Sequence, residues 1–136
     1  MKFSVNQQDL QKSLGYCQGV IEKRSTLPIL SNVLLEINSG HLTITATDLD
    51  LIFVHKISNV EIFEEGKTTT SSSIIYDIVR KISSGSKISF SNPSESKLQL
   101  ESEKSIFNLN CISASEFPLT DENFNQNEFL IKLKDL

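Results

Sequence analysis

The feature that most constrains the fold is a series of short segments, from Ile29 onward, in which apolar and polar residues alternate. Alternation with a period of two is typical of β-strands that bury one face, whereas an amphipathic helix repeats its apolar residues every three to four positions. The connections between these segments are too short to hold the crossover helix that parallel neighbours need. The sequence therefore predicts an antiparallel sheet.

Turn residues separate the predicted strands. The turns are Asn38-Ser39-Gly40, Asp48-Leu49-Asp50 and Glu65-Gly66-Lys67, followed later by polar turns. The predicted strands, in chain order, are Lys2 to Val5, Ile29 to Ile37, Leu42 to Ala46, Leu51 to Ile57, Val60 to Phe63, Lys67 to Ser72, Lys87 to Ser91, Lys97 to Glu101 and Ile106 to Ile112.

Two segments have helical spacing instead. The first follows the opening strand, and the side-chain oxygen of Asn6 or Asp9 is expected to cap it. The second runs from about Ser73 to Ile82, with a serine cluster as its cap. Their predicted core stripes are Leu10, Leu14, Cys17 and Ile21 in the first helix, and Ile75, Val79 and Ile82 in the second. The predicted fold class is α+β, two helices packed on antiparallel sheet in the order β-α-β-β-β-β-α-β-β-β.

The chain of 136 residues has the size of one domain with a packed core. Residues 1–118 are expected to form that domain. Residues 119–127, which are polar and acidic, are the predicted linker. The alternating segment at 128–136 is expected to be the first strand of a second domain, because one strand cannot fold alone. We therefore expect a fragment of a longer protein, and a monomer or weak assembly when it is isolated.

Composition limits the class of protein. The net charge is −4 and the pI is near 5.2, so any contact with nucleic acid has to be local rather than spread over a basic surface. No apolar run approaches the roughly 20 residues that cross a bilayer, and the first ten residues are too polar for a signal peptide. We expect a cytoplasmic protein without a membrane partner, in which Cys17 and Cys111 are buried, reduced thiols.

Catalytic and metal-binding patterns are missing from the sequence. His41 and His55 have no second ligand type at short range, and no glycine-rich phosphate loop occurs. Asp48 and Asp50 could in principle hold a divalent cation or act as an acid/base pair, but aspartate is also a preferred turn residue. No cofactor, metal or catalytic residue is predicted, and a hydrolase that uses the two aspartates is the weakest hypothesis.

The basic residues follow the two predicted helices. Lys12 lies on the polar side of the first helix, and Lys23 and Arg24 come at its C-terminal end. Arg80 and Lys81 come near the end of the second helix, where cations also stabilise the helix dipole. These residues serve the dipole alone or form a shared basic surface for DNA.

A second apolar strip runs along the second helix. Ile74 and Ile78 lie four residues apart, offset from the core stripe. Such a strip is typical of an interface, and equally of a helix that is buried on both sides within its own domain.

Several motifs occur together and in a fixed order. The chain opens with MKF, Arg24 leads into TLPILSNVLLEI at Thr26 to Ile37, LTITATDLD follows at Leu42 to Asp50, and Phe117-Pro118 comes near the end. In this combination the sequence resembles, over nearly its whole length, the N-terminal domain of the bacterial DNA polymerase III beta sliding clamp family.

The resemblance implies a processivity factor of DNA replication rather than an enzyme. Three such domains form a protomer, and two protomers pair head to tail into a ring that encircles duplex DNA. The full-length protein then has the polymerase III catalytic subunit and the clamp loader as partners, through a peptide pocket in the later domains. The alternative is a protein-interaction module of clamp-like fold that never meets DNA.

The resemblance also assigns site residues. Arg24 matches a DNA-contacting arginine, and Lys12 and Arg80 fall on the helices that face the channel. Ser73 replaces an arginine that the family often has, so Lys81 supplies part of that charge or the DNA contact is weaker.

A further set of residues matches the family's ring-closing interface. Phe107 and Leu109 match an apolar pair on its edge strand, and alternation puts both on one face with Ser105. Without the resemblance, a core-facing pair is the preferred interpretation. The other matching residues are Ile78, the basic Lys97 and Lys104, and Ile74 and Ile106, which replace residues that are often basic and imply a more apolar interface.

Overall fold

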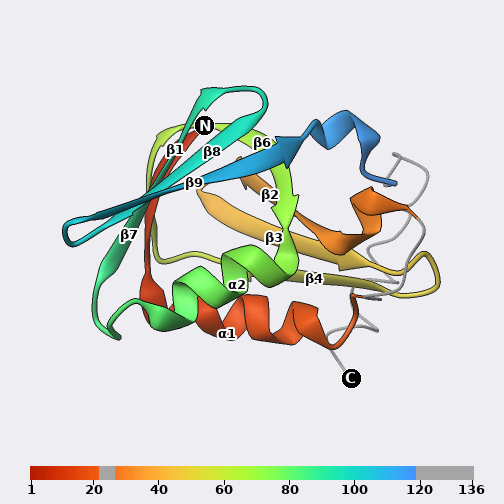
Figure 1. Cartoon of the computed structure of the whole chain (residues 1–136), viewed down its shortest axis with the longest axis horizontal. Coiled ribbons are helices and arrows are strands. Elements are labelled where there is room, and N and C mark those ends of the chain that lie inside the picture. Colours follow the sequence, from red (N-terminus) through yellow and green to blue (C-terminus); the bar gives the residue numbers. More distant parts are fainter. Residues whose placement is uncertain (22–26, 119–136) are drawn as a thin grey trace.

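The computed structural model describes residues 1–21 and 27–118, and in them the predicted α+β class is confirmed. Two α-helices pack on nine antiparallel strands (Figure 1). The elements are β1 (Lys2–Asn6), α1 (Gln7–Gln18), β2 (Asn32–Asn38), β3 (His41–Thr47), β4 (Ile52–Ile57), β5 (Val60–Glu64), β6 (Gly66–Ser71), α2 (Ser72–Lys81), β7 (Lys87–Ser94), β8 (Lys97–Ser102) and β9 (Ser105–Ile112).

The strands form one sheet in the order β4-β3-β2-β6-β9-β8-β7-β1-β5. The chain runs twice through a strand, a helix and then further strands, and in each pass the strand before the helix joins strands of the other pass. β1 pairs with β7, and β6 pairs with β2. The helices lie side by side along one side of the folded sheet (Figure 1).

All nine predicted strand segments occur, but the predicted order counts only four strands between the helices, one fewer than the five segments predicted there. Five strands rather than four lie between α1 and α2 in the structure. A turn at Ser58 separates β4 from β5, and the Ser58 carbonyl accepts a hydrogen bond from the Val60 N–H at 3.0 Å. β4 then pairs with β3 at one edge of the sheet, while β5 pairs with β1 at the other.

The strand predicted from Ile29 begins three residues later, at Asn32. Pro28 opens a short 3-10 turn over Pro28–Ser31, in which the Leu30 N–H donates to the Leu27 carbonyl at 3.0 Å. Proline fixes its own φ near the helical value and has no N–H to offer a neighbouring strand, so the turn is favoured over the strand here.

The cap predicted for the first helix is wrong. Asn6 is the N-cap residue, but its side chain makes no capping hydrogen bond, and Asp9 lies inside the helix. Instead the Gln7 N–H donates to the Ser86 carbonyl at 2.9 Å. In the second helix the Ser71 hydroxyl accepts from the Ile74 N–H at 3.3 Å, as the serine cluster predicted.

The core lies between the helices and the sheet. Phe3 of β1 and Phe90 of β7 stack with ring centroids 4.6 Å apart, and both are 1% exposed. The predicted helix stripes are buried as well, except that Ile21 lies beyond the end of α1 and Ile82 beyond the end of α2, both only partly buried.

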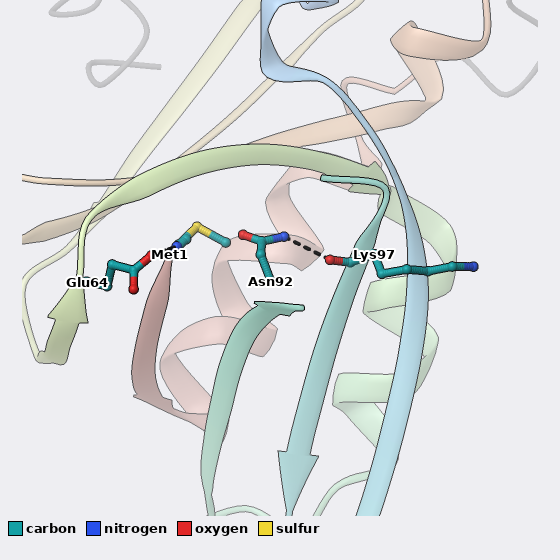
Figure 2. Close-up of polar contacts among 4 residues, drawn as sticks. All are labelled: Met1, Glu64, Asn92 and Lys97. Atoms are coloured by element: carbon teal, nitrogen blue, oxygen red, sulfur yellow. Dashed lines mark hydrogen bonds and ion pairs between the residues drawn. The ribbon is translucent and has the colours of Figure 1, made fainter. Parts of the chain in front are cut away.

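The amino terminus is fixed against the sheet (Figure 2). The Met1 ammonium group donates to Glu64 Oε1 at 2.8 Å, and this hydrogen bond holds the pKa of Glu64 below its ordinary value. The Met1 carbonyl accepts from the Asn92 N–H at 3.3 Å. Gly66 lies directly beside Met1, and a Cβ at Gly66 would approach the Met1 Cβ to 2.9 Å.

The two cysteines differ from each other. Cys17 is fully buried, and burial raises the pKa of its thiol to about 12. Cys111, predicted as a second buried thiol, is only partly buried, though burial still raises its pKa. No helix within the described ranges is both long enough and apolar enough to cross a membrane.

We expect Gly66→Ala to lower the free energy of unfolding by about 2 kcal/mol, through backbone strain at φ +156° and the close approach to Met1. Gly85→Ala is the matched control, because Gly85 also has a positive φ, +91°, but nothing within 4 Å of an added Cβ. Urea unfolding of both variants measures the difference. Equal losses would contradict the role of the Met1 contact.

We expect a thiol reagent at mildly alkaline pH to label Cys111 well before Cys17, because only the thiolate reacts and the Cys17 thiol is buried with a pKa near 12. The time course of labelling checks this. In Cys111→Ser the fast phase should vanish, and the remaining thiol should react only when urea unfolds the chain. Fast labelling of the folded variant would contradict the burial of Cys17.

Candidate functional site

The two helices are antiparallel and are joined by two buried or half-buried amides. Gln7 Nε2, at the start of α1, donates to the Val79 carbonyl near the end of α2 at 2.8 Å. Gln18 Nε2, at the end of α1, donates to Ser72 Oγ at the start of α2 at 2.7 Å. The C-terminal ends of the helices therefore lie at opposite ends of the pair (Figure 1).

Two of the predicted DNA-binding residues lie exposed on the described helices. Lys12 is on α1, and Arg80 is near the end of α2, which lies beside the start of α1. Lys23 and Arg24 lie outside the described residues.

Arg80 already has two partners within its own helix. Its guanidinium is 3.2 Å from Asp77 Oδ1 and lies 5.5 Å from the centre of the Tyr76 ring. An exposed pair of this kind stabilises the helix only slightly, but it directs the arginine along α2.

A groove runs along α1, with Tyr76 of α2 and Ser84 also lining it. We call it the helix groove. Among the residues described, Lys12 supplies its single charge and no carboxylate lines it. Its lining residues are Gln7, Gln8, Gln11, Lys12, Gly15, Tyr16, Tyr76 and Ser84.

A second groove lies on the other side of α2, between that helix and the end of the β8–β9 hairpin. We call it the seam groove. It contains Lys81, which the sequence assigned to DNA, together with three isoleucines of α2 and its end. Its lining residues are Ile74, Asp77, Ile78, Lys81, Ile82, Ser102, Glu103, Ser105 and Phe107.

The apolar strip on α2 is not buried on both sides. Ile74 is 51% exposed, and Ile78 is half-buried beside the core. Both residues line the seam groove, so the interpretation of a doubly buried helix is wrong, and the interface stays a prediction.

Strand β9 borders the seam groove, and most of one of its edges is unpaired. On its paired edge, β8 pairs with Ser105 to Asn110. On its other edge, β6 pairs only with Cys111 and Ile112. Among the residues described, no strand pairs with that edge from Ser105 to Asn110.

The predicted apolar pair on β9 is divided between core and groove. Leu109 is 7% exposed and belongs to the core, so the core-facing interpretation holds for it. Phe107 is half-buried and lines the seam groove. The alternation itself is as predicted, since Ile106, on the opposite face, is 56% exposed.

Two exposed lysines lie on the β8–β9 hairpin. Lys97 Nζ donates to Asn110 Oδ1 at 2.6 Å, so its side chain extends across β9 (Figure 2). The Lys97 carbonyl accepts from Asn92 Nδ2 at 3.0 Å, which fixes the start of β8. Lys104 follows Glu103, which turns the chain with φ +56°.

The residues considered as catalytic or metal-binding candidates have structural roles. Asp48 Oδ1 accepts from the N–H groups of Asp50 at 2.9 Å and Leu51 at 2.7 Å, so the turn interpretation is confirmed. His55 Nδ1 lies 2.9 Å from Ser13 Oγ, between β4 and α1. A search of the described ranges finds no cluster of three potential metal ligands.

The sequence did not single out the residues that line the helix groove apart from Lys12. Gln7, Gln8 and Gln11 lie on α1, and Tyr76 faces them from α2. Projecting the polar residues of the first helix onto its faces would have grouped the glutamines. That they share a groove with Tyr76 depends on the relative orientation of the helices.

Comparison with known proteins shows the same fold and order of motifs. The profile of the DNA polymerase III beta subunit, N-terminal domain, matches residues 1–121. The beta sliding clamp of Escherichia coli strain K12 is 35% identical over 131 residues, which is 96% of this chain and 36% of the relative. That of Caulobacter vibrioides strain NA1000 is 36% identical over 120 residues, which is 88% of this chain and 32% of the relative.

Solved structures agree. The sliding clamp of Bartonella birtlesii superposes with a TM-score of 0.83 at 38% identity, covering 88% of this chain and 34% of that protein. The chain spans about a third of the length of these relatives. Since the profile matches nearly the whole of its length, the chain belongs to the DNA polymerase III beta subunit family, as an N-terminal domain.

Proposed function

We propose that this domain is one sector of a ring-shaped sliding clamp that encircles duplex DNA and tethers a replicative polymerase. The observation that carries the proposal is the match of residues 1–121 to the family of beta sliding clamps, at a TM-score of 0.83 to solved members. The ring acts by topology, so the domain needs no catalytic group and works in the cytoplasm beside the chromosome.

The helix pair is the wall that faces DNA in this proposal. Lys12 and Arg80 are exposed on it, and Lys23 and Arg24 are proposed to extend the contact. Each phosphate that a cation neutralises adds a salt-dependent increment of affinity. A few weak contacts therefore suit a ring that has to slide.

The seam groove and the open edge of β9 form the proposed ring-closing surface. An extended strand of a second copy can pair with Ser105 to Asn110 while apolar side chains enter the groove beside Ile74, Ile78 and Phe107. Lys97, Lys104 and Lys81 border this surface and are proposed to face acidic residues of the partner copy. Leu109 supports the strand from the core side.

The polymerase III catalytic subunit and the clamp loader are the proposed partners of the full-length ring. Neither is proposed to bind this domain through the two grooves, because the family resemblance puts the peptide-binding pocket in the later domains.

We expect the full-length protein, once loaded, to remain on nicked circular duplex DNA and to leave when the circle is cut, because a topological link is lost only at an end. Gel filtration of the DNA before and after cutting measures retention. Equal retention on circular and linear DNA would contradict the clamp, and binding to neither would favour a protein-interaction module of the same fold.

We expect Ile74→Glu to weaken pairing of the full-length protein at least tenfold, because closure would then remove a carboxylate from water in place of the apolar side chain of the half-exposed isoleucine. Phe63→Glu is the matched control, since Phe63 is 64% exposed on β5, away from α2 and β9. Sedimentation at several concentrations gives both dissociation constants. Equal effects of the two changes would remove Ile74 from the ring-closing surface.

A further inference from the structure

We propose that Gln11 is a phosphate-contacting residue of the helix groove and that the buried Gln7 is its positioning residue. The pair would let this domain hold duplex DNA mainly through an uncharged, oriented hydrogen-bond donor. The inference rests on the proposed function and adds to it a specific contact, made by residues that neither charge nor the family resemblance singled out.

Gln7 is held by two hydrogen bonds from one nitrogen. The residue is 1% exposed, and its Nε2 donates to the Val79 carbonyl at 2.8 Å and to Gln11 Oε1 at 2.7 Å. The Val79 carbonyl fixes the orientation of the Gln7 amide, because a rotated amide would set oxygen against oxygen.

The orientation of Gln11 follows from that of Gln7. Since Gln11 Oε1 accepts from Gln7, the Gln11 amide nitrogen is the end left to donate elsewhere. No acceptor for it occurs among residues 1–21 and 27–118. Gln11 lines the helix groove, so its N–H groups are available to a ligand there.

A glutamine at position 7 is less favourable for stability than an apolar residue would be. Its Oε1 has no hydrogen-bond donor in the described part of the chain, and a buried amide that is only half satisfied is less favourable than an apolar side chain of similar size. The Val79 carbonyl does not depend on Gln7, because it also accepts from the Ile82 N–H at 3.1 Å. Orientation of Gln11 is the role that a methionine could not perform.

The charges of the two helices favour an anionic ligand such as a phosphate backbone. Few of these charges, however, lie in the helix groove. The described helices carry three cations, Lys12, Arg80 and Lys81, against the carboxylates of Asp9 and Asp77. Arg80 is paired with Asp77, and Lys81 lies in the seam groove. The helix groove itself has Lys12, neutral donors and no carboxylate, which fits an anion that is approached by hydrogen bonding more than by charge.

The test is a titration of the isotope-labelled chain with a short duplex DNA at low salt, followed by NMR of backbone and side-chain amides. We expect the Gln11 side-chain amide signals to shift and Gln11→Glu to weaken binding about tenfold, since a donor is replaced by an anion. Gln99→Glu, which makes the same charge change on β8, is the matched control and should leave binding nearly unchanged.

Gln7→Met separates positioning from folding. We expect it to weaken binding about threefold while the thermal midpoint stays equal or rises. Gln11→Lys should make the dependence of log affinity on log salt steeper by about one, the increment of one neutralised phosphate.

Three outcomes would overturn the inference. A Gln11 amide that does not shift while other signals of α1 and α2 do would overturn it and leave the DNA-facing wall intact. Equal effects of Gln11→Glu and Gln99→Glu would show that only the net charge of the chain affects DNA binding, and not a hydrogen bond from Gln11. A duplex that shifts no signal of either helix would overturn both the inference and the assignment of this wall to DNA, whereas ring formation is tested separately by retention on circular DNA.

Discussion

The exchange of strands between the two passes of the chain is the constraint on which the rest of the structure depends. β1 precedes α1 but lies between β7 and β5, and β6 precedes α2 but lies between β2 and β9. Neither pass can complete its sheet alone, so one core, with Phe3 stacked on Phe90, forms from both. The exchange also fixes the helices antiparallel. Because β6 ends at Ser71, where α2 begins, it reaches only the last residues of β9, and the remaining edge of β9 is left open beside α2.

Periodicity predicted the elements well because it reports which side of an element is buried. All nine strand segments and both helices occur close to their predicted bounds. The errors lie where local and tertiary preferences compete. Pro28 turned the first residues of a predicted strand into a 3-10 turn, and a hydrogen bond from Gln7 to the distant Ser86 took the place of a side-chain cap. The pairing of β4 and β5 at opposite edges of the sheet could not be predicted, because no local pattern records which strand a segment pairs with.

The candidate site was less predictable, since its residues are brought together by the orientation of α1 against α2. Charge along the sequence identified Lys12, Arg80 and Lys81, but only the structure shows that Lys12 and Lys81 line different grooves. Alternation put Phe107 and Leu109 on one face correctly, yet it could not say that this face turns into the core at Leu109. Helical spacing could have grouped the glutamines of α1, but their hydrogen bonds depend on neighbours that only the fold brings to them.

Helix α2 therefore borders two surfaces with opposite requirements. Tyr76 lines the helix groove on one side of α2, Ile74 and Ile78 line the seam groove on the other, and Val79 lies in the core. The proposed ring would have to close firmly, which burial of apolar area supplies, and to grip DNA weakly, which a nearly neutral wall supplies. Because one rigid helix separates these surfaces, closure can be strengthened by apolar residues at 74 and 78 without adding charge to the wall. The apolar residues of this chain at Ile74 and Ile106, and its serine at Ser73, are consistent with that division.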